Sequence, residues 1–377
     1  MILKNIKLTN YRNYEYLDLN FSSNINIIYG NNAQGKTNLL ESIYVLAFTR
    51  SHRIFSDNNL IMKNKNKSNI SGLLDTDGID NYLKIELDEN KKNIFVDNEN
   101  IKKVSNYISK MNVIIFFPED LFIIKGTPKD RRKFLDSEIT QFVNGYYELI
   151  NDYNKILKIR NDFLKKIHNK EKINEQYFNI INDYLIQKGS MIIKIRYKFI
   201  SQINKYVEKI FYNIMRIKNF NIKYENCLNI NSLDENIENI FKIRLEENYE
   251  NDIKNGSTSV GPHRDDFSCC IGENSVKEYG SQGQQRIAII SFKLAELLLF
   301  KNNKKVNPIL LLDDVFSELD ERKKNNLLKY IDDNIQVIIT TTDLNKIDND
   351  LLKKSRKIKI SNGKVISIRE EKQNGRK

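Results

Sequence analysis

Tryptophan is absent from this 377-residue chain, and proline and cysteine are scarce, with four and three residues. Cys269 and Cys270 are adjacent and therefore poorly placed for an ordinary disulfide, and with Cys227 they form no metal-ligand spacing. No run approaches the roughly 18 consecutive apolar residues that a membrane helix requires. Residues 1–6 alternate in polarity like a strand rather than a signal peptide. These absences exclude a disulfide framework and predict a globular, soluble protein of the cytoplasm.

Positive charge is in excess. The formal net charge is +12 and the isoelectric point is near 9.2, which fits a nucleic-acid partner because phosphate backbones bind chiefly Lys and Arg. Lysine is abundant along the whole chain, so its position is more informative than its total. Residues 151–218 hold 15 Lys and Arg against 6 Asp and Glu. This segment is consistent either with a DNA-binding surface or with a solvated helical face.

The first third of the chain predicts strands around one helix. Apolar residues at helical spacing predict a helix over residues 36–48. The Asp-Asn-Glu-Asn run at 97–100 predicts a turn. Alternating polarity or short β-rich runs predict strands at residues 2–8, 14–21, 24–29, 70–74, 82–87, 93–96 and 113–117.

The rest of the chain changes character twice. No proline lies between Pro128 and Pro262, and apolar residues at helical intervals over 129–218 predict two or more long helices with a turn near 168–174. A polar tail over 370–377 is expected to be disordered. Between the helical segment and the tail we expect strands at 220–224, 267–271, 309–312 and 336–340. We also expect helices at 233–251, 284–300 and 321–331, and a hairpin of 357–360 with 365–368.

One motif fits a phosphate-binding loop. Residues 30–37 match G-x-x-x-x-G-K-[ST], with a predicted strand before them and a predicted helix after them. In that setting backbone N–H groups cradle phosphate oxygens, Lys36 reaches the β and γ phosphates of ATP, and Thr37 places its hydroxyl on Mg²⁺. A chance match on a surface loop is the alternative. The predicted ATP-binding residues are Gly30, Asn31, Asn32, Ala33, Gln34, Gly35, Lys36 and Thr37.

A second motif supplies carboxylates. The apolar run at 309–312 ends in Asp313 and Asp314, and a Mg²⁺ held by one hydroxyl needs a carboxylate from the end of a buried strand. We expect Asp313 to bind the metal ion together with Thr37, directly or through water, and Asp314 to act as the base for the attacking water. A core strand that ends in two capping aspartates is the alternative.

The spacing of these motifs implies an insertion. Thr37 and Asp313 are 276 positions apart, far more than a minimal nucleotide-binding domain needs, so a large segment must interrupt that domain. About 30 residues before Asp313 lies the run Ser281-Gln282-Gly283-Gln284-Gln285-Arg286, immediately before a predicted helix. Such a start is either a second phosphate-binding site or a simple N-cap.

Together these residues resemble the ATP-binding-cassette heads of chromosome-maintenance and DNA-repair ATPases. Within that class, further blocks look like the RecF family and occur in the order expected of it. Nearly the whole chain takes part in this resemblance, apart from the helical segment and the tail. The blocks are Tyr11-Arg12-Asn13-Tyr14, Ser51-His52-Arg53, Pro118-Glu119-Asp120-Leu121, Gly126-Thr127-Pro128, residues 131–136 and residues 261–266.

The resemblance implies an α/β fold, namely an ABC-type, SMC-like P-loop ATPase head with an inserted α-helical arm domain. The corresponding division of the chain places the N-terminal part of the head at 1–120 and the arm at 121–218. The C-terminal part of the head follows at 219–369, and the tail occupies 370–377.

A mechanism follows from the same resemblance. Two heads of this family sandwich two ATP molecules, so Ser281, Gly283 and Gln284 of one chain would face the γ-phosphate held by Lys36 of the other. ATP thereby stabilises a homodimer until it is hydrolysed. Residues 317–320, Ser-Glu-Leu-Asp, are implied at the same interface, and Arg12 is implied to add positive charge near the phosphates.

The function that the resemblance implies is that of a recombination mediator. It implies an ATP-dependent clamp on single-stranded and on linear or gapped double-stranded DNA, acting in replication, gap repair and SOS induction, associated with the nucleoid and working with RecR and RecO. The alternatives are another SMC-like cassette ATPase, which an insert of about 90 helical residues is too short to favour, and a metabolic kinase or transporter ATP-binding subunit.

Two departures from the broader cassette pattern predict weak ATPase activity. Transporter heads place Glu after the metal-binding Asp, whereas this chain has Asp314. They also carry His after the next strand, where this chain has the run Thr-Thr-Thr-Asp at 340–343. His263 and Arg264 fit either a role that faces a phosphate or an interface, or a structural cluster paired with Asp265 and Asp266. Arg131 and Arg132 fit either DNA contact or ion pairs at a helix start.

Overall fold

The structure is a computed structural model that describes residues 1–53, 56–317, 319–331 and 334–370. It divides into two compact units, one of residues 1–120 with 293–377 and one of residues 121–292. The sequence-based limit between residues 120 and 121 coincides with this division. The limit placed between 218 and 219 lies inside the second unit. Apart from Glu370, the predicted disordered tail lies outside the described residues.

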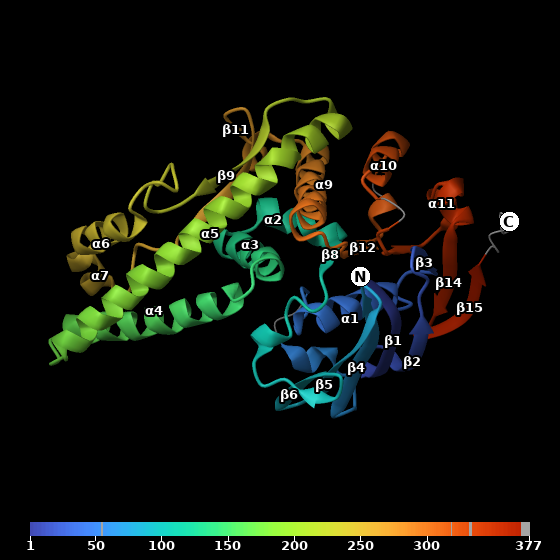
Figure 1. Ribbon diagram of the computed structural model, residues 1–377, viewed down its shortest axis with the longest axis horizontal. Coiled ribbons are helices and arrows are strands. Elements are labelled where there is room, and N and C mark those ends of the chain that lie inside the picture. The colour runs from blue at the N-terminus through green and yellow to red at the C-terminus, as the bar shows by residue number, and fades with distance from the viewer. Residues whose placement is uncertain (54–55, 318, 332–333, 371–377) are drawn as a thin grey trace. The chain divides into compact units, whose positions relative to one another are not determined.

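The first unit is built on a six-stranded sheet (Figure 1). Its strand order is β15-β14-β3-β13-β12-β8, and all pairs are parallel except β14 with β15. The central strands are short apolar runs whose residues are almost all buried, as expected for a sheet covered on both faces. Their bounds are β3 Ile25–Tyr29, β8 Val113–Phe116, β12 Ile309–Asp313, β13 Val337–Thr341, β14 Ser355–Ser361 and β15 Lys364–Glu370.

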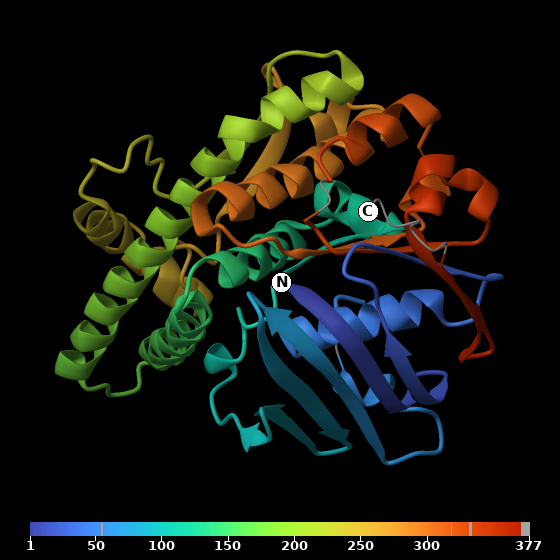
Figure 2. The same ribbon diagram turned by 45° about the vertical axis from the view of Figure 1, so that its right-hand side comes forward.

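A second sheet in this unit is antiparallel, with the order β2-β1-β4-β5-β6-β7. Its buried residues join those of the helix α1, Lys36–Phe48, and of the parallel sheet in one hydrophobic core. Figure 2 shows α1 beside this sheet, and buried residues lie nearly all round the helix because it packs on both sheets. The strands are β1 Ile2–Tyr11, β2 Tyr14–Asn20, β4 Lys67–Thr76, β5 Ile79–Asp88, β6 Lys91–Val96 and β7 Glu99–Asn100.

The predicted elements of this unit are confirmed, with ends that differ by a few residues. The helix predicted over 36–48 has those bounds. The turn predicted over 97–100 is wrong in its second half, because Glu99 and Asn100 pair with β6 as the short strand β7. The helix predicted over 321–331 is α10, Glu321–Leu328, and the short helix α11, Asn349–Lys353, was not predicted.

Helices dominate the start of the second unit, and all of them except the first, which has five residues, are long. They are α2 Leu121–Lys125, α3 Pro128–Phe142, α4 Tyr146–His168 and α5 Glu175–Met215. Thr127 and Asp130 form a capping box that begins α3. The turn between α4 and α5 lies where the sequence predicted it. Gly189 lies inside the unbroken α5, and a Cβ there would come within 2.5 Å of the Phe241 ring, so glycine permits this close packing.

The remainder of the second unit packs on these helices, which explains why the unit extends to Phe292. The strand β9, Phe220–Glu225, pairs with β10, Asp266–Ile271, and β10 pairs with β11, Asn274–Ser275. Asn204 of α5 exchanges two side-chain hydrogen bonds with the Ile222 backbone, and the rings of Phe211 and Phe220 stack with centroids 4.1 Å apart.

Four further helices complete the chain between β9 and β12. The single acidic helix predicted over 233–251 is wrong, because the structure has two helices that meet at Asn248. None of the helices in the described ranges combines the length and the apolar character needed to cross a membrane. The four are α6 Ile237–Glu247, α7 Tyr249–Asn255, α8 Val276–Tyr279 and α9 Gln282–Leu299.

Candidate nucleotide-binding site

The loop between β3 and α1 has the geometry of a phosphate cradle. Gly35 has φ of 108°, a left-handed conformation that glycine adopts readily, and its carbonyl accepts a hydrogen bond of 2.9 Å from the buried Tyr14 hydroxyl. The Gln34 side chain accepts hydrogen bonds from Ser361 and from the Asn362 backbone at the β14–β15 turn. The loop is therefore held at its base, while its crest, residues 31–33, is exposed.

Lys36 lies across this loop. Its Nζ donates hydrogen bonds of 2.8 Å to the carbonyl oxygens of both Gly30 and Asn31. Burial lowers the pKa of the Lys36 ammonium, while Asp314 and Asp313 act in the opposite direction. A buried cation beside the loop crest is the group that a triphosphate chain requires.

Thr37 and Asp313 meet as the sequence predicted. The Thr37 hydroxyl donates to the Asp313 carboxylate at 3.1 Å, and the Thr340 hydroxyl donates to the same oxygen at 2.5 Å. The parallel pairing of β12 with β13 brings Asp313 opposite Thr340. Burial raises the pKa of Asp313, and the hydrogen bonds from Thr340 and Thr37 offset part of that rise.

These oxygens suit a hard cation such as Mg²⁺. Thr37 donates its hydroxyl proton in the hydrogen bond to Asp313 and keeps an oxygen lone pair for the metal ion. In the described part of the chain no group of three or more His, Cys, Asp or Glu side chains can hold a metal on its own. A Mg²⁺ here would therefore depend on phosphate and water oxygens for its other ligands, as is usual for this ion.

Asp314 follows in an uncommon backbone conformation. Its φ is 49°, and its N–H donates to the Thr340 hydroxyl at 3.0 Å. Thr340 thus braces both aspartates at the end of β12, a role that the sequence did not indicate.

The second predicted phosphate-binding element is the start of α9. The Ser281 N–H donates to the Gln284 side chain at 2.7 Å, and the Gln284 N–H donates to the Ser281 hydroxyl at 3.3 Å, which makes a capping box. Residues 281–283 are exposed, and no heavy atom closer than 3.9 Å would meet a Cβ at Gly283. The capped helix start thus presents an open surface, and its role toward a nucleotide stays a prediction.

Arg12 has a different environment from the one that the resemblance implied. Its guanidinium makes a two-point contact with Glu41 on α1, at 2.9 and 2.7 Å, and Ser51 donates to the same carboxylate. Glu41 is fully buried. Burial acts to raise the pKa of Glu41, but the hydrogen bonds from Arg12 and Ser51 outweigh it and hold the pKa below its ordinary value. The signal in the sequence for this ion pair was a glutamate within the mostly apolar run of residues 39–48.

The predicted interface run at 317–320 is only partly described, because Glu318 lies outside the described residues. Asp320 caps α10 by accepting a hydrogen bond from the Lys323 N–H, and it also pairs with the Lys323 ammonium at 2.6 Å. Its part in an interface stays a prediction.

Arg131, Arg132 and His263, for each of which the sequence allowed two roles, make contacts inside the second unit. Arg131 pairs with Asp266 of β10, rather than with the aspartates of its own helix, and Arg132 donates to the Asp265 carbonyl. His263 bonds to Tyr153 and to the Thr258 carbonyl, and burial lowers its pKa to about 4, so the ring is neutral. These contacts favour the structural reading, although the partners of His263 are not aspartates.

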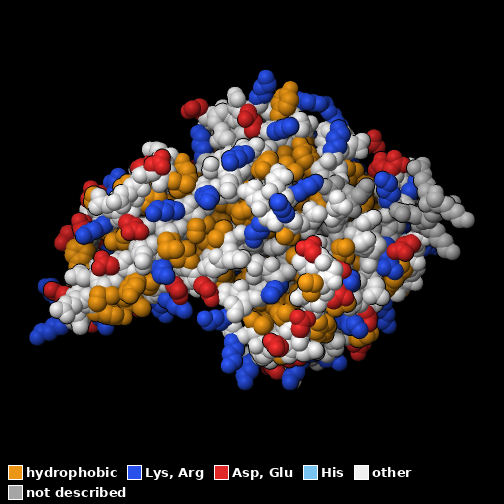
Figure 3. Space-filling view, viewed as in Figure 1, with side chains coloured by type: hydrophobic (Ala, Val, Ile, Leu, Met, Phe, Trp, Pro, Cys, Tyr) orange, Lys and Arg blue, Asp and Glu red, His pale blue; other side chains and the backbone are white. Residues whose placement is uncertain are grey.

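The basic segment 151–218 is sorted by burial. Arg160 and Arg196 are inside the unit, where they pair with Asp252 and with Asp136. Most of the lysines are exposed, and Figure 3 shows a row of Lys and Arg side chains along α5. The exposed positive charge of this segment therefore comes mainly from lysine.

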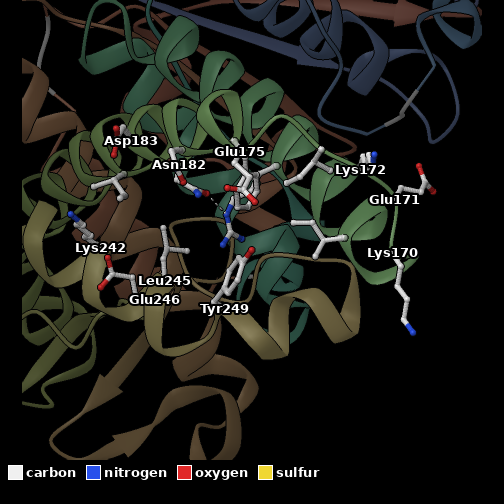
Figure 4. A pocket seen from close by; sticks show the side chains of 16 residues that line it. Lys170, Glu171, Lys172, Glu175, Asn182, Asp183, Lys242, Leu245, Glu246 and Tyr249 are labelled. Carbon is white, nitrogen blue, oxygen red and sulfur yellow. Dashed lines mark hydrogen bonds between the residues drawn. The ribbon is translucent and has the colours of Figure 1, made fainter.

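A hollow of about 1020 Å³ lies in the second unit near the turn between α4 and α5. Figure 4 shows Lys170, Glu171 and Lys172 on one side of it and Asp183 and Lys242 on the other. Arg160 and three lysines line it together with four carboxylates. Because these charges nearly balance, the hollow lacks the positive field of a phosphate site.

Comparison with known proteins first defines a class. The model of the RecF/RecN/SMC N-terminal domain matches residues 2–366. A solved SMC head bound to the C-terminal winged-helix domain of ScpA has a TM-score of 0.54 at 13% identity, over 97% of each chain, which is a likeness of fold alone. The fold and the phosphate loop are thus those of an SMC-type ATPase head.

Much closer relatives narrow the class. The proteins of Latilactobacillus sakei and Oenococcus oeni described as DNA replication and repair protein RecF are 37% and 39% identical, over 98% and 97% of this chain and all of theirs. A solved recombination mediator protein RecF with ATP, of the RecFOR pathway, has a TM-score of 0.90 at 34% identity over 98% of this chain and 97% of its own. The chain belongs to the RecF family.

Proposed function

We propose that this chain is an ATP-dependent, DNA-binding recombination mediator that pairs with a second copy of itself when ATP is bound. The observation that carries the proposal is the set of Lys36, Thr37 and Asp313 around one exposed phosphate loop. These groups supply the cation, the hydroxyl and the carboxylate that Mg²⁺ and a triphosphate need. The solved RecF described with ATP supports the same nucleotide.

The second copy supplies the other half of the site. Ser281, Gly283 and Gln284 form an exposed, capped start of an 18-residue helix, and such a start favours an anion. ATP held by the loop of one copy then contacts Ser281 to Gln284 of the other. ATP favours the paired state because it binds that state more tightly than the single chain.

Hydrolysis ends the pairing and is slow. Asp314 has one methylene fewer than the glutamate of transporter heads, so its carboxylate lies farther from the attacking water. Thr340 braces Asp313 and the Asp314 backbone, and it begins the run that replaces the histidine found after this strand in transporter heads. Arg12 adds positive charge near the phosphates only through its electrostatic field, since its guanidinium donates to Glu41 and to the Asn59 carbonyl.

DNA is the macromolecular partner. The exposed lysines of α4 and α5 and the net charge of +12 suit the phosphate backbone of single-stranded, linear or gapped double-stranded DNA. The solved relative is described as part of the RecFOR pathway, which supports RecR and RecO as the protein partners. The curated relatives are described as DNA replication and repair proteins, which supports replication and gap repair as the processes. SOS induction is added only by resemblance to the family. The protein then acts in the cytoplasm, on the nucleoid.

The test combines sizing with DNA titration. The wild-type chain and Lys36→Met are sized with and without ATP and Mg²⁺, and each is titrated with gapped DNA at two salt concentrations. We expect ATP to convert the wild type to a dimer that binds the DNA, and Lys36→Met to stay monomeric because the phosphate loop has lost its cation. A wild-type chain that stays monomeric with ATP and ignores DNA would sink the proposal.

A further inference from the structure

Tyr279 is the most exposed of the large hydrophobic side chains in the described part of the chain, at 74%. It is the last residue of α8 and comes two positions before Ser281, the cap of α9. Single exposed hydrophobic residues are common on protein surfaces and need no explanation by themselves. Two further features of Tyr279, its fixed backbone and its closeness to Ser281, indicate that its exposure serves a contact.

The backbone that carries Tyr279 is fixed to α9. The side-chain amide of Gln285 donates hydrogen bonds to the carbonyl oxygens of Val276 and Lys277, at 3.1 and 3.3 Å. The Gly280 N–H donates to the Val276 carbonyl, and a Cβ at Gly280 would lie only 2.4 Å from that oxygen. Glycine is therefore required there for the turn to close, and the turn holds Tyr279 beside the helix start.

Distance along the chain then limits what Tyr279 can touch. Two residues span at most about 7 Å, so the Cα of Tyr279 lies within that distance of the Cα of Ser281. If Ser281 contacts the γ-phosphate held by a second copy, as the proposed function requires, the ring is within reach of the phosphate loop of that copy. Residues 31–33 are the exposed part of that loop.

We propose that Tyr279 is a contact residue of the ATP-bound dimer, with its ring packed on the exposed crest of the second copy's phosphate loop, residues 31–33. Tyrosine suits this position because it buries a large flat surface while few side-chain torsions are immobilised, and its hydroxyl can bond to a backbone group. The inference rests on the proposed function, and it extends the dimer interface beyond Ser281 to Gln284.

The experiment compares three variants of the full chain. We expect Tyr279→Ala to weaken ATP-dependent dimerisation about tenfold, since truncation of a buried tyrosine at an interface commonly has an effect of this size. ATP affinity of the single chain, measured at low protein concentration, stays unchanged. Tyr279→Phe keeps the ring and most of the affinity. Tyr16→Ala is the matched control, because Tyr16 is 63% exposed but lies on β2.

A photo-cross-linker at position 279 gives an independent readout. We expect an intermolecular product that requires ATP and joins this position to the peptide that contains residues 31–33. A wild type that dimerises with ATP while Tyr279→Ala dimerises equally well, or a product with a different peptide, overturns the inference and leaves the proposed function intact. A wild type that does not dimerise overturns both.

Discussion

Single residues at the nucleotide site show a conflict between stability and function. Asp313 is buried next to two hydroxyl groups, and in the proposed function its metal ion arrives only with the nucleotide. A buried carboxylate without a cation is costly, as the raised pKa of Asp313 indicates. The burial of Asp313 at the end of a strand thus opposes folding, and the proposed metal-binding role supplies a reason for it.

Asp313→Asn should stabilise the nucleotide-free chain. The pKa of Asp313 in the folded chain is raised above its ordinary value of 3.8. The free energy of unfolding therefore decreases as the pH rises from 3.8 through this raised pKa, and at neutral pH the charged carboxylate destabilises the fold in full. We expect the melting temperature to rise by roughly 2 °C, which about 1 kcal/mol gives in a protein of this size, and Mg²⁺-dependent ATP binding to be lost. Calorimetry and nucleotide titration measure the two effects.

Asp18→Asn is the control for that measurement. The pKa of Asp18 is lowered by the hydrogen bond from Lys7, so its carboxylate contributes favourably to stability at neutral pH and its removal is not expected to stabilise the chain. A melting temperature of Asp313→Asn below that of the wild type would contradict this account of the site.

At the scale of elements, the β1–β2 turn is joined to α1 by the pair of Arg12 and Glu41. Removal of one member of a buried pair leaves the other uncompensated, and the cost is about 3 kcal/mol in free energy of unfolding. We therefore expect Arg12→Met to lower the stability of the chain by this amount at neutral pH, as measured by denaturant unfolding.

The pH dependence separates this role from phosphate binding. In the wild type the pKa of Glu41 is depressed, so its stabilising contribution is present above the ordinary value of 4.5 and is lost as the pH falls through the folded value. The difference in free energy of unfolding between the wild type and Arg12→Met should thus become smaller below pH 4.5. Lys7→Met, which breaks an exposed pair with Asp18, should have little effect. An Arg12→Met chain of unchanged stability but weaker ATP binding would instead assign Arg12 to the phosphates.

Local patterns predicted most elements because each of those patterns is complete within one segment. Short apolar runs marked the central strands, and the phosphate-loop motif located α1. What the sequence left open depends on partners distant along the chain. Arg131 pairs with Asp266, 135 positions away, and nothing near Arg131 distinguishes that partner from Asp130 or Asp136. The break at Asn248 was missed for a related reason, since charged residues continue across it.

At the scale of the whole molecule, the question is which part of the positive charge binds DNA. Arg160 and Arg196 are engaged inside the second unit, whereas Lys194 and Lys198 are exposed on α5. Counterion release links each phosphate contact to the salt dependence of binding. Exposed lysines that share a helix face are therefore the candidates for DNA contact.

We expect a double change, Lys194→Glu with Lys198→Glu, to weaken DNA binding at least tenfold and to reduce the slope of log affinity against log salt by about 2. Fluorescence anisotropy at several salt concentrations measures both quantities. The matched control is Lys102→Glu with Lys103→Glu, which changes the net charge equally at exposed positions before β8. An equal loss in both double variants would mean that net charge, and not α5, governs binding.

The order of strands in the parallel sheet also has a consequence for how the protein is made. Among the strands that the structure describes, β3, which leads into the phosphate loop, pairs with β13 and β14 alone, and neither exists until the ribosome has passed residue 337. At about 5–20 residues per second, the nascent chain then waits roughly 15–60 s with that apolar strand unpaired. The nucleotide site thus assembles last, although its signature motif is among the first segments to be translated.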